Sequence, residues 1–250
     1  MNDTKIVTVT GAPGSGKTTW AQALAYSLEA AGAGRVLLLH TDFVSPPLIT
    51  FGPGETRQEG KTLSRILLSP TLTRATILRE IRTVRGHPNL GFLGYGSGDA
   101  GKALPIFGEA QGRAVIEELA NVTDYLIVDG SSYTQGDILE SCVLPYSDVV
   151  INLRNPSLRS LAWEKMWHPE DIPGQHVWYV KSATREGETE LWNLMPDAPA
   201  ADEGPVCLPY FEKVYKKQFE CADPESYMKI GPFRKAAAAL SRRVMEACRD

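Results

Sequence analysis

The sequence predicts an α/β protein with a doubly wound, mostly parallel β-sheet and helices on both faces. Short, almost continuous apolar runs at 35–42 and 124–130 are typical of parallel strands buried on both faces. Segments with helical periodicity alternate with such runs along the chain, and this alternation favours βαβ units. The first apolar run, which begins at Ile6, ends in a glycine-rich loop, and a helical pattern follows the loop directly.

The remaining segments continue the alternation between helices and strands. Apolar residues at helical spacing indicate each helix, and a short apolar run bounded by polar residues indicates each strand. The helical pattern at 63–81 is broken into two pieces at Pro70. In chain order we expect helices at 63–81 and 109–122, through Ile138 and Cys142, from Asn155 and Pro156 onward, and from Pro232 to about Cys248, and strands at 90–95, 147–153 and 176–180.

The loop after the first strand has the spacing of a phosphate-binding loop, because residues 11–18 match GxxxxGK[ST] at every fixed position. Gly11, Gly14 and Gly16 permit backbone angles that a Cβ atom obstructs, so successive N–H groups can turn inward around an anion. Lys17 then reaches the β- and γ-phosphates, Thr18 offers a hydroxyl group to Mg²⁺, and the helix adds its positive end. The residues expected to bind the nucleotide here are Gly11, Ala12, Pro13, Gly14, Ser15, Gly16, Lys17, Thr18 and Thr19.

A glycine-rich turn between a strand and a helix is the simpler explanation of the same glycines. The context argues against it, because a strand pattern precedes the loop and a helical pattern follows at Ala21, Leu24, Ala25 and Leu28. A phosphate loop therefore explains the segment better than a turn does.

Two acidic residues follow predicted strands and are candidates for the metal and for catalysis. Asp129 ends the strand at 124–130, the usual position of the acid that holds Mg²⁺ in a phosphate-loop protein. Asp42 ends the strand at 35–42, where an acid can orient attacking water or contact the metal, although a capping or turn role explains it equally well. We therefore assign Lys17, Asp42 and Asp129 to catalysis, and Thr18, Asp42 and Asp129 to the metal.

The composition is that of an ordinary globular protein, and the length of 250 residues fits one domain over 1–250. The formal charge of −4 argues against bulk electrostatic binding of nucleic acid, while a local basic patch stays compatible with it. The four cysteines show no metal-ligand spacing and indicate reduced thiols. The sequence shows no signal peptide and no apolar run of membrane-spanning length, so we expect a cytoplasmic protein.

Four segments, taken in order, resemble the MinD/ParA group of P-loop ATPases of the SIMIBI class, including its CpaE/TadZ-like members. They are TGAPGSGKTTWAQALAYSLEAAG, RVLLLHTDFVSPPL, YLIVDG and SDVVINLRNPSLRSL, and the resemblance covers nearly all of the chain. It implies a P-loop NTPase fold and an ATP-dependent switch that dimerises face to face around the nucleotide. Such a switch positions a protein partner at the membrane, the pole or the nucleoid, for pilus assembly, secretion, conjugation or partition.

The resemblance also implies ATP and Mg²⁺ as ligands and gives roles to particular residues. Lys17 and Thr18 would bind phosphate and Mg²⁺, Asp42 would align the hydrolytic water, and Asp129 would support the metal. Ser182, in the segment after the strand at 176–180, and Pro209 fall where the family holds its adenine base.

Three positions depart from the family pattern. Ala12 stands where the family usually carries a signature lysine that reaches the partner's nucleotide, so we expect slow hydrolysis or a differently built dimer. His40 replaces the first acid of the DxD-like strand end, and a structural role for this histidine is favoured over a catalytic one. Lys181 and Ser182 replace the asparagine that reads adenine, which leaves the choice between ATP and GTP open.

Two other functions stay open at this point. A small-molecule or nucleotide kinase uses the same loop with an arginine-bearing lid, for which the sequence offers Arg74, Arg79, Arg82 and Arg85, although a solvated helix explains these arginines as well. A nucleotide-binding adaptor with little turnover is compatible with Ala12. The final helix has a basic side that is compatible with a membrane surface, but its apolar face is mostly alanine, which favours docking against the protein's own sheet.

Overall fold

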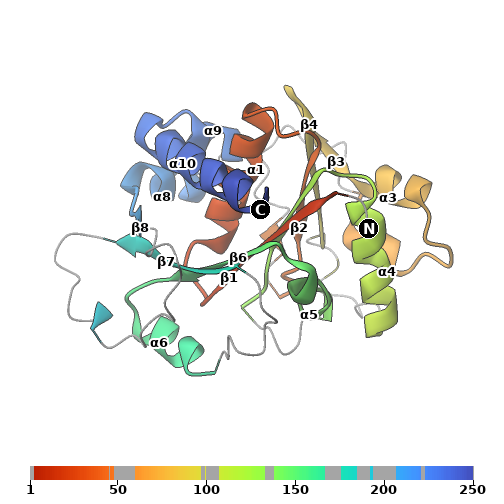
Figure 1. Ribbon diagram of the computed structural model, residues 1–250, viewed down its shortest axis with the longest axis horizontal. Helices are drawn as coiled ribbons and strands as arrows, with labels where there is room; N and C mark the ends of the chain where they lie inside the picture. The colour runs from red at the N-terminus through yellow and green to blue at the C-terminus, as the bar shows by residue number, and fades with distance from the viewer. Residues whose placement is uncertain are drawn as a thin grey trace.

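The computed structural model describes residues 3–44, 46–47, 60–96, 99, 107–132, 138–166, 176–184, 192–193, 207–220 and 223–249. Within these residues, eight strands form one sheet in the order β3-β4-β2-β5-β1-β6-β7-β8 (Figure 1). The strands are β1 (Lys5–Gly11), β2 (Val36–His40), β3 (Arg82–Val84), β4 (His87–Gly94), β5 (Tyr125–Asp129), β6 (Val149–Arg154), β7 (His176–Thr184) and β8 (Cys207–Pro209).

The sheet is parallel except for β3, which pairs antiparallel with β4. Strand β1 lies in the middle, between β5 and β6. The chain first builds the β2 side of the sheet and then crosses to the β6 side, so the strand order reverses at β1. Ligands of open α/β sheets bind at the carboxyl ends of the strands where the order reverses. In this protein, the glycine-rich loop occupies that point.

Helices cover both faces of the sheet, as the sequence predicts (Figure 1). On one face, α1, α9 and α10 enclose a core that contains Leu24, Ile127 and Phe233. On the other face, residues of α2, α3, α4 and α5 form a second core around Leu126. The helices are α1 (Lys17–Ala30), α2 (Leu63–Leu67), α3 (Arg74–Glu80), α4 (Glu109–Ala120), α5 (Ile138–Val143), the 3₁₀ helix η3 (Leu144–Tyr146), α6 (Leu158–Glu164), α8 (Glu212–Phe219), α9 (Pro224–Met228) and α10 (Gly231–Ala247).

Local sequence accounts for several helix starts. The side chains of Thr73, Ser157 and Asp223 accept hydrogen bonds from backbone N–H groups in the first turns of α3, α6 and α9. Helix α1 instead begins after Gly16, whose φ of 90° is left-handed, so the chain turns sharply from the loop into the helix.

The edge of the sheet differs from the sequence prediction. The helical pattern ends at Glu80, and Arg82 begins the short strand β3, which turns at Gly86 into β4. Strand β4 starts at His87, earlier than the predicted 90–95, because its first three residues, His87 to Asn89, are not buried and give no apolar signal. The sequence analysis also missed β8, α8 and α9, of which β8 and α9 are too short to show a clear period.

Helix α10 packs against α1, which itself covers the sheet, and it buries Phe233, Ala237, Leu240 and Val244. Among the described residues, no helix is long and apolar enough to cross a membrane.

Candidate nucleotide-binding site

The glycine-rich loop has the backbone that a phosphate-binding loop requires. Gly11, Gly14 and Gly16 have φ values of 142°, 77° and 90°, a region that favours glycine. A Cβ atom on Gly11 would lie 2.3 Å from the carbonyl oxygen of Leu153 in the neighbouring strand β6. This position therefore excludes every other residue type, whereas Gly14 has open space around it and is constrained by φ alone.

Lys17 is buried and folds back over the loop. Its Nζ atom donates to the carbonyl oxygens of Gly11 and Ala12 at 3.0 and 3.2 Å, and to the hydroxyl group of Ser132 after β5. Burial lowers the pKa of Lys17, while the carboxylates of Asp129, Glu140 and Asp42, in decreasing order, oppose this shift. The lysine is thus held at the loop by oxygen acceptors.

Thr18 and Asp129 come together although they lie far apart in the sequence. The hydroxyl group of Thr18, in the first turn of α1, donates to Oδ2 of Asp129 at the end of β5, at 2.8 Å. Asp129 is only 1% exposed, and its Oδ1 atom has no hydrogen-bond partner among the described residues. The same Oδ2 atom lies 2.7 Å from Nδ1 of His40, the last residue of β2.

This pair fits a magnesium ion. A hydroxyl group and a buried carboxylate with a spare oxygen are the oxygen donors that Mg²⁺ prefers. In the described part of the chain, no group of three or more His, Cys, Asp or Glu side chains could hold a metal by itself. The ion would therefore take its other ligands from nucleotide phosphates and water, as is usual for Mg²⁺.

Asp42 lies just beyond β2, next to this group. Its Oδ1 atom accepts a hydrogen bond from the backbone N–H of Val44 at 2.9 Å, which is the turn role considered above. It is also among the carboxylates that raise the pKa of Lys17. Asp42 therefore stabilises the turn that follows β2 and also adds negative charge near Lys17.

Two further hydrogen bonds hold the loop from the β6 and β7 side of the sheet. The amide group of Asn155 donates to the carbonyl oxygen of Gly14 at 3.0 Å, and the Ser182 hydroxyl donates to the carbonyl oxygen of Ser15 at 2.7 Å. The side chain of Ala12 is fully buried within the loop. The position of the signature lysine therefore offers no cation in this protein.

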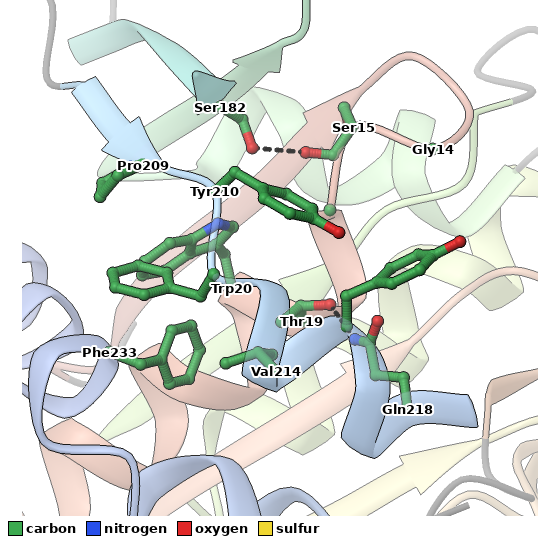
Figure 2. Close-up of a pocket in the computed structure, with 13 residues that line it drawn as sticks. Gly14, Ser15, Thr19, Trp20, Ser182, Pro209, Tyr210, Val214, Gln218 and Phe233 are labelled. Carbon is green, nitrogen blue, oxygen red and sulfur yellow. Dashed lines mark hydrogen bonds between the residues drawn. The ribbon is translucent and has the colours of Figure 1, made fainter. Parts of the chain in front are cut away.

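A cavity of about 300 Å³ opens beside the loop (Figure 2). It contains both residues that the family resemblance places near the base, Ser182 and Pro209, together with the loop glycines Gly14 and Gly16. Aromatic rings supply most of its apolar wall, and Trp20 packs there against Phe211 and Phe233. The residues that line it are Gly14, Ser15, Gly16, Thr19, Trp20, Ser182, Pro209, Tyr210, Phe211, Val214, Tyr215, Gln218 and Phe233.

Sequence reasoning missed several members of this wall. Tyr210 and Phe211, which follow Pro209 directly in the sequence, both line the cavity. Gln218 of α8 donates to the hydroxyl group of Thr19, which ties α8 to the first turn of α1 (Figure 2). The only sequence signal was the position of this segment directly after Pro209.

The arginines considered for a kinase lid lie at the β3 edge of the sheet. Arg79 contacts the buried carboxylate of Glu80, and Nε of Arg82 donates to the backbone carbonyl of Lys61 at 2.9 Å. Strands β4, β2 and β5 separate β3 from β1 and its loop. Arg79 and Arg82 therefore make these contacts at the edge of the sheet and not at the glycine-rich loop.

No protein-family model and no curated protein matches the chain, but many solved structures do. A ParA family ATPase from Chlorobium tepidum is 17% identical, with a TM-score of 0.71 over 96% of this chain and 98% of that chain. The septum site-determining protein MinD from Pyrococcus horikoshii, complexed with Mg-ADP, is 18% identical, with a TM-score of 0.68 over 96% of both chains. A MinC:MinD cell division protein complex from Aquifex aeolicus gives 15% identity and a TM-score of 0.68, over 97% of this chain and 96% of that chain. The chain therefore has the α/β fold of the MinD and ParA ATPases.

Proposed function

We propose that this chain is a Mg²⁺-dependent ATP-binding protein that hydrolyses ATP slowly and acts as a nucleotide switch. In this proposal it forms one domain over residues 1–250 and positions or assembles a larger cellular machine. The observation that carries the proposal is the convergence of Lys17, Thr18 and Asp129 on one glycine-rich loop. Lys17 is buried there among oxygen acceptors, and Thr18 contacts Asp129 directly.

The nucleotide triphosphate would lie along residues 11–19. Backbone N–H groups of the loop and the positive end of α1 would face its phosphates. Lys17 would exchange the carbonyl oxygens of Gly11 and Ala12 for phosphate oxygens, since a cation binds an anionic oxygen more strongly than a neutral one. The positive charge of Lys17 would thus reach the phosphates without a large movement of the backbone.

The adenine base would occupy the cavity beside the loop. The cavity begins at Gly14 and Gly16, so a nucleotide whose phosphates lie in the loop can reach it. Its aromatic and proline wall, including Tyr210 and Pro209, suits the flat apolar faces of a base. Because the Ser182 hydroxyl donates a hydrogen bond to the carbonyl oxygen of Ser15, this side chain supports the loop as well as the cavity wall.

Magnesium would be held by Thr18 and, through water, by Asp129. The bound ion would neutralise charge that develops on the phosphates during hydrolysis. Asp42 would orient the attacking water from the end of β2, where its carboxylate already acts on Lys17. The MinD from Pyrococcus horikoshii, which shares this fold, binds Mg-ADP.

Ala12 supports slow turnover. A lysine at this position would supply positive charge to phosphates across a dimer, and alanine does not. An adaptor that binds ATP with almost no hydrolysis is the second candidate for this reason. The rate of phosphate release by the purified protein distinguishes the two.

The proposed switch forms a nucleotide-dependent homodimer and binds a protein partner. Two strongly exposed apolar residues lie at the ends of α6. Leu158, its first residue, is 72% exposed, and Met166, two residues after its end, is 69% exposed. Asn155, three residues before α6, is bonded to the phosphate loop. A surface so close to the loop can respond to the nucleotide, and MinD from Aquifex aeolicus forms a complex with MinC.

Equilibrium binding of fluorescent adenine and guanine nucleotides, with Mg²⁺ or EDTA, tests this proposal together with phosphate release. We expect micromolar or tighter binding of the adenine nucleotide that Mg²⁺ strengthens, and slow release of phosphate. The matched control is Lys17→Ala. Nucleotide binding by Lys17→Ala as tight as that of the wild-type protein would contradict the proposal. Phosphate transfer only when a small acceptor is added would also contradict it.

A further inference from the structure

His40 is buried against the candidate metal site. It ends β2 and lies in register with Asp129, the last residue of the neighbouring strand β5. Its side chain is fully buried, and its Nδ1 atom is 2.7 Å from Oδ2 of Asp129.

The chemistry of the contact defines which atom donates. We assign the proton of this bond to Nδ1 of His40, because a carboxylate accepts hydrogen bonds and cannot donate them. Thr18 donates its hydroxyl proton to the same Oδ2 atom at 2.8 Å. Two donors therefore hold one carboxylate oxygen, and Oδ1 is left without a hydrogen-bond partner among the described residues.

Packing fixes the imidazole ring in this position. The ring lies nearly parallel to that of Phe92 in β4, with an angle of 6° between the planes. Beyond the ring, the backbone N–H of Thr41 donates to the carbonyl oxygen of Asp129 at 3.1 Å, so the ends of β2 and β5 are joined. The donor therefore comes from a rigid part of the sheet.

A histidine acts differently here from an acid. A second carboxylate at this distance would repel Asp129, and one of the two would tend to take up a proton. The Nδ1–H group instead attracts the carboxylate and restricts its rotation. In metalloproteins, such partners of a ligand set its orientation and tune metal affinity.

We propose that His40 is a positioning residue, whose Nδ1–H group holds Asp129 in the orientation that supports Mg²⁺ beside Thr18. This inference rests on the proposed function, because it requires that nucleotide and Mg²⁺ bind at the loop.

The test uses the Mg²⁺ dependence of nucleotide binding rather than turnover. The quantity measured is the ratio of the dissociation constant of fluorescent ADP in EDTA to that in Mg²⁺, over a Mg²⁺ titration. Loss of an outer-shell group that supports a bound metal typically weakens metal binding about 10- to 100-fold. We therefore expect this ratio to fall about tenfold or more in His40→Leu, which removes the donor.

Two further variants separate the donor from simple packing. In His40→Asn the amide N–H group can take the place of Nδ1–H, and we expect the ratio of the two dissociation constants to return to most of its wild-type value. In His40→Gln the amide group lies one carbon further out, and we expect no recovery. These two polar variants decide the question even if His40→Leu does not fold.

Thr8→Val is the matched control for lost stability. Thr8 forms a buried 2.7 Å hydrogen bond with Ser147, so the variant removes one buried bond without touching Asp129. We expect it to keep the wild-type ratio. A wild-type ratio in His40→Gln and His40→Leu, or equal loss in Asn and Gln variants, would overturn the role of His40. A wild-type protein that shows no Mg²⁺-dependent binding would instead overturn the proposed function.

Discussion

The side-chain amide of Asn155 donates a 3.0 Å hydrogen bond to the carbonyl oxygen of Gly14, across 141 residues of sequence. The bond joins the segment after β6 to the tip of the phosphate loop. Asn155 is in turn held by the hydroxyl group of Ser157, which caps α6. The shape of the loop therefore depends on a residue outside its motif.

Removal of this tether should weaken nucleotide binding. A typical hydrogen bond contributes about 1 kcal/mol, so we expect Asn155→Ala to raise the dissociation constant about fivefold. Thr73→Ala, which removes the cap of the distant helix α3, is the control and should leave it unchanged. Isothermal titration calorimetry measures both, and equal affinity in Asn155→Ala and wild type would show that the loop keeps its shape alone.

Ser132→Ala should have opposite effects on stability and on binding. The Ser132 hydroxyl accepts a hydrogen bond from Nζ of Lys17, and we expect Lys17 to leave it for a phosphate when nucleotide binds. Loss of the bond costs the free state about 1 kcal/mol, so the variant should unfold at lower denaturant and bind nucleotide a few times more tightly. Chemical denaturation and nucleotide titration give the two values. Weaker binding would indicate that Ser132 contacts the nucleotide itself.

Two glycines of the loop should differ in their tolerance of alanine. At Gly11, a Cβ atom would meet the carbonyl oxygen of Leu153 at 2.3 Å, so β1 and β6 must separate. At Gly14, only the left-handed φ of 77° opposes alanine, which costs about 1–2 kcal/mol. We expect Gly11→Ala to lower the free energy of unfolding by much more than Gly14→Ala does. Similar losses in a denaturant titration would contradict the close approach of the two strands.

The thiol of Cys248 should resist modification. Burial raises its pKa to about 11 from the ordinary 9.0, and the nearby charge of Asp148 adds to this shift. At pH 8 the thiolate population is then about 100-fold lower than that of an ordinary thiol. Maleimide labelling followed by peptide mass spectrometry should modify the exposed Cys207 long before Cys248.

The same shift gives a pH dependence of stability with a definite sign. The Cys248 thiol binds its proton more tightly in the folded chain than in the unfolded one. Its contribution is therefore complete below pH 9 and is lost as the pH rises from 9 towards 11. Cys248→Ala should show a smaller loss of stability over this range in denaturant titrations, and an identical loss would assign it to other groups.

The parts of the candidate site that depend on local pattern could be predicted from the sequence. The loop, Lys17 and Thr18 follow from one motif, and Asp129 follows from its place at the end of an apolar strand. The central strands were predicted for the same reason, since burial on both faces makes them continuous apolar runs. The alternation of these runs with helices was sufficient for the fold class.

Contacts between distant segments could not be predicted in the same way. The pairing of His40 with Asp129 requires that β2 and β5 be neighbours in a given register, which no local pattern encodes. The contact between Ser132 and Lys17 and the wall of the cavity formed by α8 depend equally on tertiary packing. Strand β3 was missed because its three residues, Arg82–Val84, carry little apolar signal and follow directly on a helix.

We propose that nucleotide controls the assembly of this chain. Light scattering of the purified protein with Mg²⁺ and either no nucleotide, ADP or ATP, with phosphate release followed in the same samples, tests this proposal. We predict a mass that doubles only with ATP, slow phosphate release, and neither effect in Lys17→Ala. A wild-type protein that stays monomeric with ATP, and releases ADP only after a small acceptor is added, would contradict the claim.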